Sequence, residues 1–274
     1  MDRVYEINRD INKYIKKELY APLGSKYLAY LKETRGLSDD VIDNLNLGCL
    51  TDSGKLYTHL KTIGYTVEDI LNTGFFRIYG DKIYSPYNDR VIFPIKDDRN
   101  RPVAFGGRII EKNPEKAKYI NSPESDIYKK RETLYGLNLI RRAKEVIVCE
   151  GYMDAIALHN AGFTGAVAPL GTALTEEQIN KLCRYTDTLY LCFDNDLAGK
   201  KATARAIQRI SDTLMFTIRC IDISPVKDPD EFIKQYGAEA FRERIDAALS
   251  VKEWVSMVRK APIKELEVEE DIDR

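Results

Sequence analysis

The sequence is poor in the side chains that bind zinc. It has five cysteines and two histidines in 274 residues, and no two cysteines have C-x-x-C spacing. Protein zinc sites need several such ligands, at least some of them closely spaced. We therefore expect no zinc in this chain, and we expect Cys149 and Cys192, which lie in apolar runs, to be buried thiols of the core.

Long apolar stretches are also missing. No segment reaches the roughly 18 consecutive apolar residues that a membrane-spanning helix needs. The opening residues MDRVYEINRDINKY lack the apolar segment of a secretory signal. We therefore expect a cytoplasmic, monomeric protein with no membrane partner.

A strong overall charge is absent as well, because the net charge is only −1. The charge is unevenly distributed, however. Residues 90–142 hold thirteen Lys or Arg against seven Asp or Glu, a net charge of +6, so the remainder of the chain carries −7. This asymmetry favours a basic surface together with an acidic site. A solvated charged surface without a partner is the alternative.

The sequence pattern predicts an α/β protein. Up to about Gly80, apolar residues recur at helical spacing, and RVIFPI and RPVAFGGRII, joined by KDDRN, then predict a β-hairpin. From Lys144, apolar strands alternate with amphipathic helices, which indicates a parallel sheet covered on both faces. We predict a basic α+β subdomain at 1–142, a parallel-sheet domain at 143–225, and a helical segment with an acidic tail at 226–274.

Pairs of carboxylates follow three of the predicted strands. They are Glu150, Asp154, Asp194, Asp196, Asp228 and Asp230. Ligands of open parallel sheets bind outside the carboxyl ends of the strands, so we expect these side chains to converge. On extended segments, Asp194 with Asp196 and Asp228 with Asp230 would each point to one side. Such a cluster suits Mg²⁺ or Mn²⁺. The alternative is that the aspartates cap helices or occupy turns.

A series of short motifs resembles the DnaG-type bacterial primases and their Toprim domain. RVIFPI, FGGR, AKYINSPES, LYG, EGYMD, LGTALT, FDNDLAG and KDPDE occur in the order found in that family. The resemblance runs from about Ala29 to about Ala248. EGYMD with FDNDLAG matches the glutamate and the DxD pattern of Toprim domains, and the other motifs are specific to primases.

The resemblance implies synthesis of RNA primers on single-stranded DNA from ribonucleoside triphosphates. It implies that Glu150, Asp194 and Asp196 hold metal and that Asp154, Asp228 and Asp230 support the metal or the nucleotide. It further implies that four basic residues contact the template or the triphosphate; they are Arg35, Arg108, Lys118 and Lys130. Tyr119 either stacks on a base or packs within its strand. The nascent RNA, a replicative helicase and a separate zinc-ribbon protein are the other partners that it implies.

The sequence departs from the family pattern at two positions, where Asn195 and Arg131 replace glycines. Asn tolerates left-handed backbone, so we expect the Asp194–Asp196 loop to keep its form. The family's zinc ribbon and helicase-binding domain have no counterpart in the sequence, which suggests a catalytic fragment or a split primase of a mobile element.

Two other functions remain open from the residues. A non-catalytic nucleic-acid-binding subunit of a mobile element would keep the basic surface, and a Toprim nuclease would keep the acidic site. The retained carboxylates argue against the first, because they weaken phosphate binding unless metal is present. The basic motifs before Lys144 argue against the second.

Overall fold

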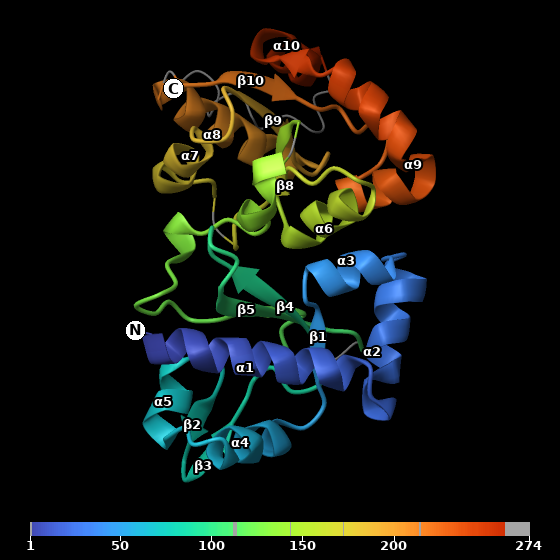
Figure 1. Ribbon diagram of the computed structural model, residues 1–274. Coiled ribbons are helices and arrows are strands. Elements are labelled where there is room, and N and C mark those ends of the chain that lie inside the picture. The colour runs from blue at the N-terminus through green and yellow to red at the C-terminus, as the bar shows by residue number, and fades with distance from the viewer. Residues whose placement is uncertain (1, 112–113, 143, 172, 214, 261–274) are drawn as a thin grey trace. The chain divides into compact units, whose positions relative to one another are not determined.

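The computed structural model describes residues 2–111, 114–142, 144–171, 173–213 and 215–260 (Figure 1). The chain forms two compact units, which we call unit 1 (residues 1–129) and unit 2 (residues 130–274). The expected acidic tail lies outside the described residues. None of the described helices is long and apolar enough to cross a membrane.

Unit 1 is built on a long amphipathic helix. In α1 (Asp2–Leu19), Ile7, Ile11 and Ile15 recur every fourth residue and are fully buried, which places them on one face of the helix. The helix packs against strands of the unit's main sheet. The remaining helices are α2 (Ser25–Ala29), a π-helical turn at Tyr30–Thr34, α3 (Asp39–Asn44), α4 (Ser53–Thr62) and α5 (Val67–Asn72).

The main sheet of unit 1 is antiparallel and has the order β1-β4-β5-β6. Its strands are β1 (Gly48–Leu50), β4 (Arg90–Lys96), β5 (Pro102–Ile109) and β6 (Tyr119–Asn121). The pairing of β4 with β5 confirms the predicted hairpin. A separate two-stranded sheet joins β2 (Arg77–Tyr79) to β3 (Lys82–Tyr84). The sequence pattern had not indicated β1, β2 or β3.

Unit 2 contains the predicted parallel sheet, in the order β11-β10-β9-β7-β8. Its strands are β7 (Val146–Cys149), β8 (Ala166–Val167), β9 (Thr188–Cys192), β10 (Thr217–Cys220) and β11 (Leu249–Ser250). The first four pair in parallel, and β11 is antiparallel. The α/β fold class is therefore confirmed.

Helices cover both faces of this sheet. They are α6 (Tyr152–Asn160), α7 (Glu176–Leu182), α8 (Leu197–Thr213), α9 (Pro229–Asp246, with a kink at Gly237) and α10 (Val251–Lys260). Val146 and Val148 share a core cluster with residues of α7, α8 and α10. The helices α6 and α9 pack together on the other side of the sheet (Figure 1).

The chain divides between Lys129 and Lys130. The boundaries predicted at residues 142 and 225 stay predictions. Cys149 and Cys192 are fully buried, as expected of core thiols, and burial raises the pKa of both.

Candidate functional site

Glu150 and Asp194 extend from neighbouring strands at one edge of the unit 2 sheet. The strands β7 and β9 pair in parallel with Cys149 opposite Cys192. Glu150 is therefore one residue past its strand and Asp194 is two residues past the adjacent one, and paired strands lie about 4.8 Å apart. Glu150 is exposed and Asp194 is part-buried. The expected convergence at this edge is present for these two side chains.

A second loop is joined to the Asp194–Asp196 segment through Asn195. The backbone N–H of Asn195 donates to the carbonyl oxygen of Lys227 (2.7 Å). Its side-chain amide donates to Ser224 Oγ and to the carbonyl oxygen of Val226, both at 3.3 Å. Asn195 does not have a positive φ, so it does not substitute for glycine by adopting left-handed backbone. It connects the loop after β9 to the loop after β10, which carries Asp228.

Asp196 and Asp228 each begin a helix. Asp196 accepts a hydrogen bond from the backbone N–H of Gly199 (3.0 Å) in the first turn of α8, and Asp228 accepts one from Glu231 (2.8 Å) at the N-cap of α9. The capping role that the sequence left as an alternative is therefore real for both residues. It places the two carboxylates at the same edge as Glu150 and Asp194, so capping and clustering are compatible.

The prediction for Asp230 was wrong in its geometry. Asp228 has extended backbone, but the helix α9 begins at Pro229, so Asp230 lies in its first turn rather than on an extended segment. Its side chain is buried and forms an ion pair with Lys234 (2.9 Å). Proline is favoured in the first turn of a helix, where its missing N–H costs nothing, and this explains the early helix start.

The electrostatics of the edge show that its carboxylates interact. Burial, followed by the negative charges of Asp194, Asp228 and Asp230, raises the pKa of Asp154 to about 8. Burial, followed by the charges of Glu150 and Asp228, raises the pKa of Asp194 to about 6. Like charges held close together disfavour ionisation. Acidic side chains from three strand ends therefore share one electrostatic site.

This donor set fits a hard divalent cation. No three Asp, Glu, His or Cys side chains in the described part of the chain lie close enough to hold a metal together. However, burial and, after it, the neighbouring carboxylates raise the pKa of Asp154 and Asp194, and a bound cation would offset both effects. The groups on offer are carboxylate oxygens, which are the ligands that Mg²⁺ and Mn²⁺ prefer. Lys227 Nζ, 3.9 Å from Asp196 Oδ2, supplies a positive charge at the rim.

The start of α8 packs directly against the Asp194–Asp196 segment. A Cβ atom built on Gly199 would lie 2.0 Å from the carbonyl oxygen of Asp194. Only glycine allows the helix to approach the loop this closely. The position of the Asp194 carboxylate therefore depends on the absence of a side chain at Gly199.

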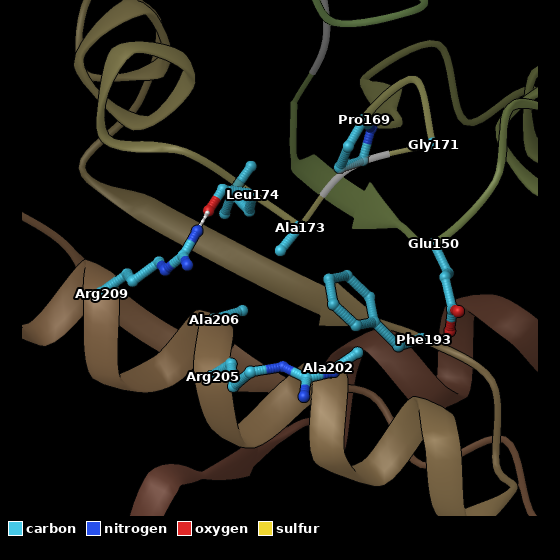
Figure 2. Close-up of a pocket in the computed structure, with 10 residues that line it drawn as sticks. All are labelled: Glu150, Pro169, Gly171, Ala173, Leu174, Phe193, Ala202, Arg205, Ala206 and Arg209. Atoms are coloured by element: carbon cyan, nitrogen blue, oxygen red, sulfur yellow. Dashed lines mark hydrogen bonds between the residues drawn. The ribbon is translucent and has the colours of Figure 1, made fainter. Parts of the chain in front are cut away.

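A pocket of about 380 Å³ opens beside Glu150 (Figure 2). Glu150 and Phe193 lie at one end, and Arg209 donates a hydrogen bond to the carbonyl oxygen of Leu174 (2.7 Å) at the other. Arg205 extends along the α8 side. The LGTALT motif contributes to the wall, which is otherwise mainly apolar. The pocket is thus a mainly apolar space with a carboxylate at one end and two arginines along one side.

In unit 1, two of the predicted binding residues meet at one tyrosine, and one of them also contacts Tyr119. Arg35 Nε donates to Tyr30 Oη (2.6 Å), and the Arg108 guanidinium carbon lies 5.2 Å from the centre of the Tyr30 ring. Arg108 Nη1 also donates to Tyr119 Oη (2.5 Å). Arg108 Nε is buried with no hydrogen-bond partner among the described residues. We call Tyr30, Arg35, Arg108, Lys118 and Tyr119 the basic-aromatic cluster.

The two remaining predicted basic residues lie outside the contacts with Tyr30. Lys118 is exposed, with its Nζ 5.9 Å from the Tyr119 ring centre. Lys130 is the first residue of unit 2, where its carbonyl oxygen accepts a hydrogen bond from Gln178. Arg131 has no positive φ and forms an ion pair with Glu177 (3.1 Å). The replacement of glycine by Arg131 therefore uses ordinary backbone.

Sequence reasoning had not identified Tyr30, Gly199, Lys227, Arg205 or Arg209 as parts of a site. Gly199 lies within FDNDLAG, so that motif was a usable signal for it. Tyr30 precedes Arg35 by five residues within a π-helical turn, and no sequence pattern indicates such a turn. Lys227 lies within KDPDE, which was a usable signal in the same way, and the two arginines line a pocket with Glu150 only through the fold.

Two family models match the chain. "DNA primase catalytic core, N-terminal domain" covers residues 14–141, and "Toprim-like" covers residues 147–233. A DNA primase of Clostridium acetobutylicum is 35% identical over 254 residues, or 91% of this chain. One of Pseudomonas aeruginosa is 39% identical over 225 residues, or 79% of this chain. The chain spans only 42% and 33% of the length of these two relatives.

Solved structures of primase catalytic cores are also similar to this chain. The E. coli primase catalytic core is 31% identical, with 93% of this chain and 83% of that chain covered and a TM-score of 0.83. A DnaG primase catalytic domain bound to single-stranded DNA is 30% identical, with 94% and 84% covered and a TM-score of 0.84.

Proposed function

This chain belongs to the DnaG-type DNA primase family, and we propose that it is a primase catalytic core that synthesises short RNA primers on single-stranded DNA. The observation that carries the proposal is the convergence of acidic side chains from three strand ends of the unit 2 sheet. A site that concentrates uncompensated negative charge is suited to a cation-dependent reaction of phosphates.

The proposed reaction is nucleotidyl transfer. The 3′-hydroxyl oxygen of the growing RNA forms a bond to the α-phosphorus of a ribonucleoside triphosphate, and pyrophosphate leaves. In this proposal Glu150, Asp194 and Asp196 hold Mg²⁺ or Mn²⁺. When bound, the metal neutralises charge on the reacting phosphates. Asp228 lies close enough to Asp194 to raise its pKa, and the charge of Asp194 in turn helps to raise the pKa of the buried Asp154, so Asp154 and Asp228 adjust the charge of the site.

Two residues of the chain hold the loop with the metal-binding carboxylates in place. Gly199 and Asn195 fix the loop that carries Asp194 and Asp196, so these carboxylates do not have to be ordered when the nucleotide arrives. Asp230 is buried in an ion pair with Lys234, and we assign it a supporting role rather than contact with the nucleotide.

The basic-aromatic cluster is the proposed template and nucleotide surface of unit 1. The guanidinium carbon of Arg108 lies 5.2 Å from the Tyr30 ring centre and 5.0 Å from the Tyr119 ring centre, which holds a positive charge between two aromatic rings. Exposed Lys118 and Tyr119 offer a charge and an aromatic face, which is the combination that binds single strands. Lys130 is the corresponding proposed contact from unit 2.

Incorporation of labelled ribonucleotides on single-stranded DNA, with Mg²⁺ or Mn²⁺, tests the proposal. The assay is run with and without an added zinc-ribbon domain. We expect Glu150→Gln to reduce synthesis by at least 100-fold, because it removes a charged ligand from the metal site, while binding of single-stranded DNA is unchanged. Glu239→Gln, which alters an exposed carboxylate of α9, is the matched control and should leave both activities intact.

Two results would contradict the proposal. Tight DNA binding with no synthesis by the wild type under any condition would favour a non-catalytic binding subunit. Metal-dependent DNA cleavage that is lost in Glu150→Gln would favour a nuclease. The helicase and zinc-ribbon partners, the monomeric state and the cytoplasmic location stay predictions.

A further inference from the structure

A small hairpin of unit 1 presents an unpartnered face. The strands β2 and β3 pair only with each other within the described structure, and the turn between them holds Gly80 and Asp81. An isolated two-stranded sheet is marginally stable unless one face packs on something. Figure 1 shows the hairpin at the margin of the unit, beside α4 and α5.

The register divides the hairpin into two different faces. Arg77 lies opposite Tyr84, Ile78 opposite Ile83, and Tyr79 opposite Lys82. Residues directly opposite each other share a face, and neighbours along a strand alternate. Ile83 packs against the core cluster of unit 1. Ile83 therefore anchors one face of the hairpin, on which Ile78 is 60% exposed, and the other face carries four residues: Arg77, Tyr79, Lys82 and Tyr84.

The outer face is aromatic and basic. Tyr79 is 80% exposed and Tyr84 is 39% exposed, and both basic residues are exposed. Each cross-strand pair joins one tyrosine to one basic residue. In one pair the tyrosine belongs to β3, and in the other it belongs to β2. Large exposed aromatic side chains gathered in one place mark a binding surface more often than a solvated one.

We propose that this face binds single-stranded nucleic acid, with Tyr79 and Tyr84 stacking on bases and Arg77 and Lys82 contacting phosphates. Flat aromatic platforms interleaved with cations are the surface that single strands need, because every base offers a π-face and every linkage a negative charge. The face contains no carboxylate and no aliphatic side chain, which makes it a poor match for a basic or purely apolar protein partner. Asp81 lies in the turn rather than on the face.

The hairpin face is separate from the basic-aromatic cluster. Tyr87, three positions after Tyr84, is buried and stacks on Phe75 in the core. Its ring lies 2.8 Å from where a Cβ atom of Gly107 would be, and neighbours along a strand face opposite sides, so Arg108 points to the other face of β5. The hairpin face is therefore a second nucleic-acid surface of unit 1, and the proposal concerns binding alone, so it does not depend on catalysis.

Fluorescence anisotropy with a labelled oligonucleotide tests the proposal in the full chain. We expect Tyr79→Ala with Tyr84→Ala to weaken binding of single-stranded DNA by about 10- to 100-fold, since stacking is lost at two bases. The double phenylalanine variant should bind as the wild type does, because it keeps both rings. Tyr236→Ala, which removes an exposed tyrosine of α9, is the control for loss of a surface ring.

The contribution of the two basic side chains is measured separately, from the salt dependence of binding. Arg77→Ala with Lys82→Ala should reduce the slope of log K against log salt concentration by about 1.4, or about 0.7 for each lost contact to a single strand. Parallel titrations with an RNA of the same sequence show whether the template or the product is the ligand. A duplex should be affected less by the tyrosine changes, because its bases are already stacked.

The proposal is overturned if both double-alanine variants bind single-stranded DNA and RNA as tightly as the wild type. Equal losses for single strands and duplex would also overturn it, because stacking would then have no part. Circular dichroism and thermal unfolding of each variant establish that it is folded. Loss of synthesis in Glu150→Gln, measured separately, reports on the catalytic proposal without touching this one.

Discussion

The carboxyl of Asp154 is buried and also lies near three other carboxyls, and both features make it more easily protonated. Its pKa is raised from 3.8 to about 8, with burial as the largest cause. Between about pH 4 and pH 8 the folded protein therefore holds a proton that the unfolded chain has released. Stability falls as pH rises whenever the folded state binds more protons. Asp154 thus destabilises the metal-free protein increasingly across this range.

Because the carboxyl of Asp154 lowers stability as pH rises, the substitution Asp154→Asn should raise stability at neutral pH. In EDTA at pH 7, the variant should be more stable than the wild type by about 2–4 kcal/mol, because the cost of a buried, repelled charge is removed. At pH 4 the two proteins should differ little. Thermal unfolding across the pH range measures the difference. A variant that is less stable at pH 7 would show that Asp154 is held by favourable contacts.

At the scale of elements, the first turn of α8 sets the position of the acidic loop. Because a methyl group at Gly199 would meet the carbonyl of Asp194 at 2.0 Å, either the helix or the loop must move in Gly199→Ala. We expect a loss of about 1–3 kcal/mol in the free energy of unfolding, which is typical of overpacking. Ribonucleotide incorporation should fall at least tenfold, because the Asp194 carboxylate is displaced.

The neighbouring Ala198→Gly is a suitable control for this prediction. Ala198 is exposed, and its replacement by glycine costs about 1 kcal/mol in helix propensity without changing the loop. Comparable stability losses in the two variants, with activity lost only in Gly199→Ala, would assign the effect to the loop. Equal activity in both would contradict the role given to this contact.

Two positions at which the family has glycine are occupied by larger residues with ordinary backbone. Asn195 and Arg131 stand where the family has glycine, and neither takes a positive φ. Asn195 instead makes two side-chain hydrogen bonds to the loop before Asp228, each worth about 1 kcal/mol. The connection between the two acidic loops therefore includes side-chain contacts that glycine could not make.

At the scale of the whole molecule, the two units carry complementary chemistry. Unit 1 contains the basic-aromatic cluster and the hairpin face, and unit 2 contains the acidic edge. We therefore expect binding of single-stranded DNA to depend strongly on salt and to depend little on divalent metal. Synthesis should depend on both.

Substitution of one exposed lysine tests this division. Lys118→Ala should lower the slope of log K against log salt concentration for single-stranded DNA by about 0.7, the value for one phosphate contact. Lys61→Ala, which removes an exposed lysine of α4, should leave the slope unchanged. Anisotropy titrations at several salt concentrations provide the measurement. A slope that falls equally in both variants would mean that only overall charge matters.

Local patterns allowed much of the fold to be predicted. Thr66 and Thr175 each form a capping box, a feature that local sequence specifies because the hydrogen bonds involved span only three residues. The hairpin of β4 and β5 and the strands β7 and β9 follow from apolar runs and turn residues for the same reason. The carboxylates at strand ends could be placed together because parallel strands end at one edge.

Contacts between distant residues decided the rest. The two arginines that meet Tyr30 lie 5 and 78 residues from it in the sequence, and the strand β11 pairs with β10 across 30 residues. The helix start at Pro229, which moved Asp230 off an extended segment, is by contrast a local effect. The hairpin face became visible only when Ile83 was seen to pack on the core. The sequence determined which elements form and which chemistry they carry, because propensity and periodicity are local. Tertiary structure alone decided which side chains meet, since that depends on the packing of the whole chain.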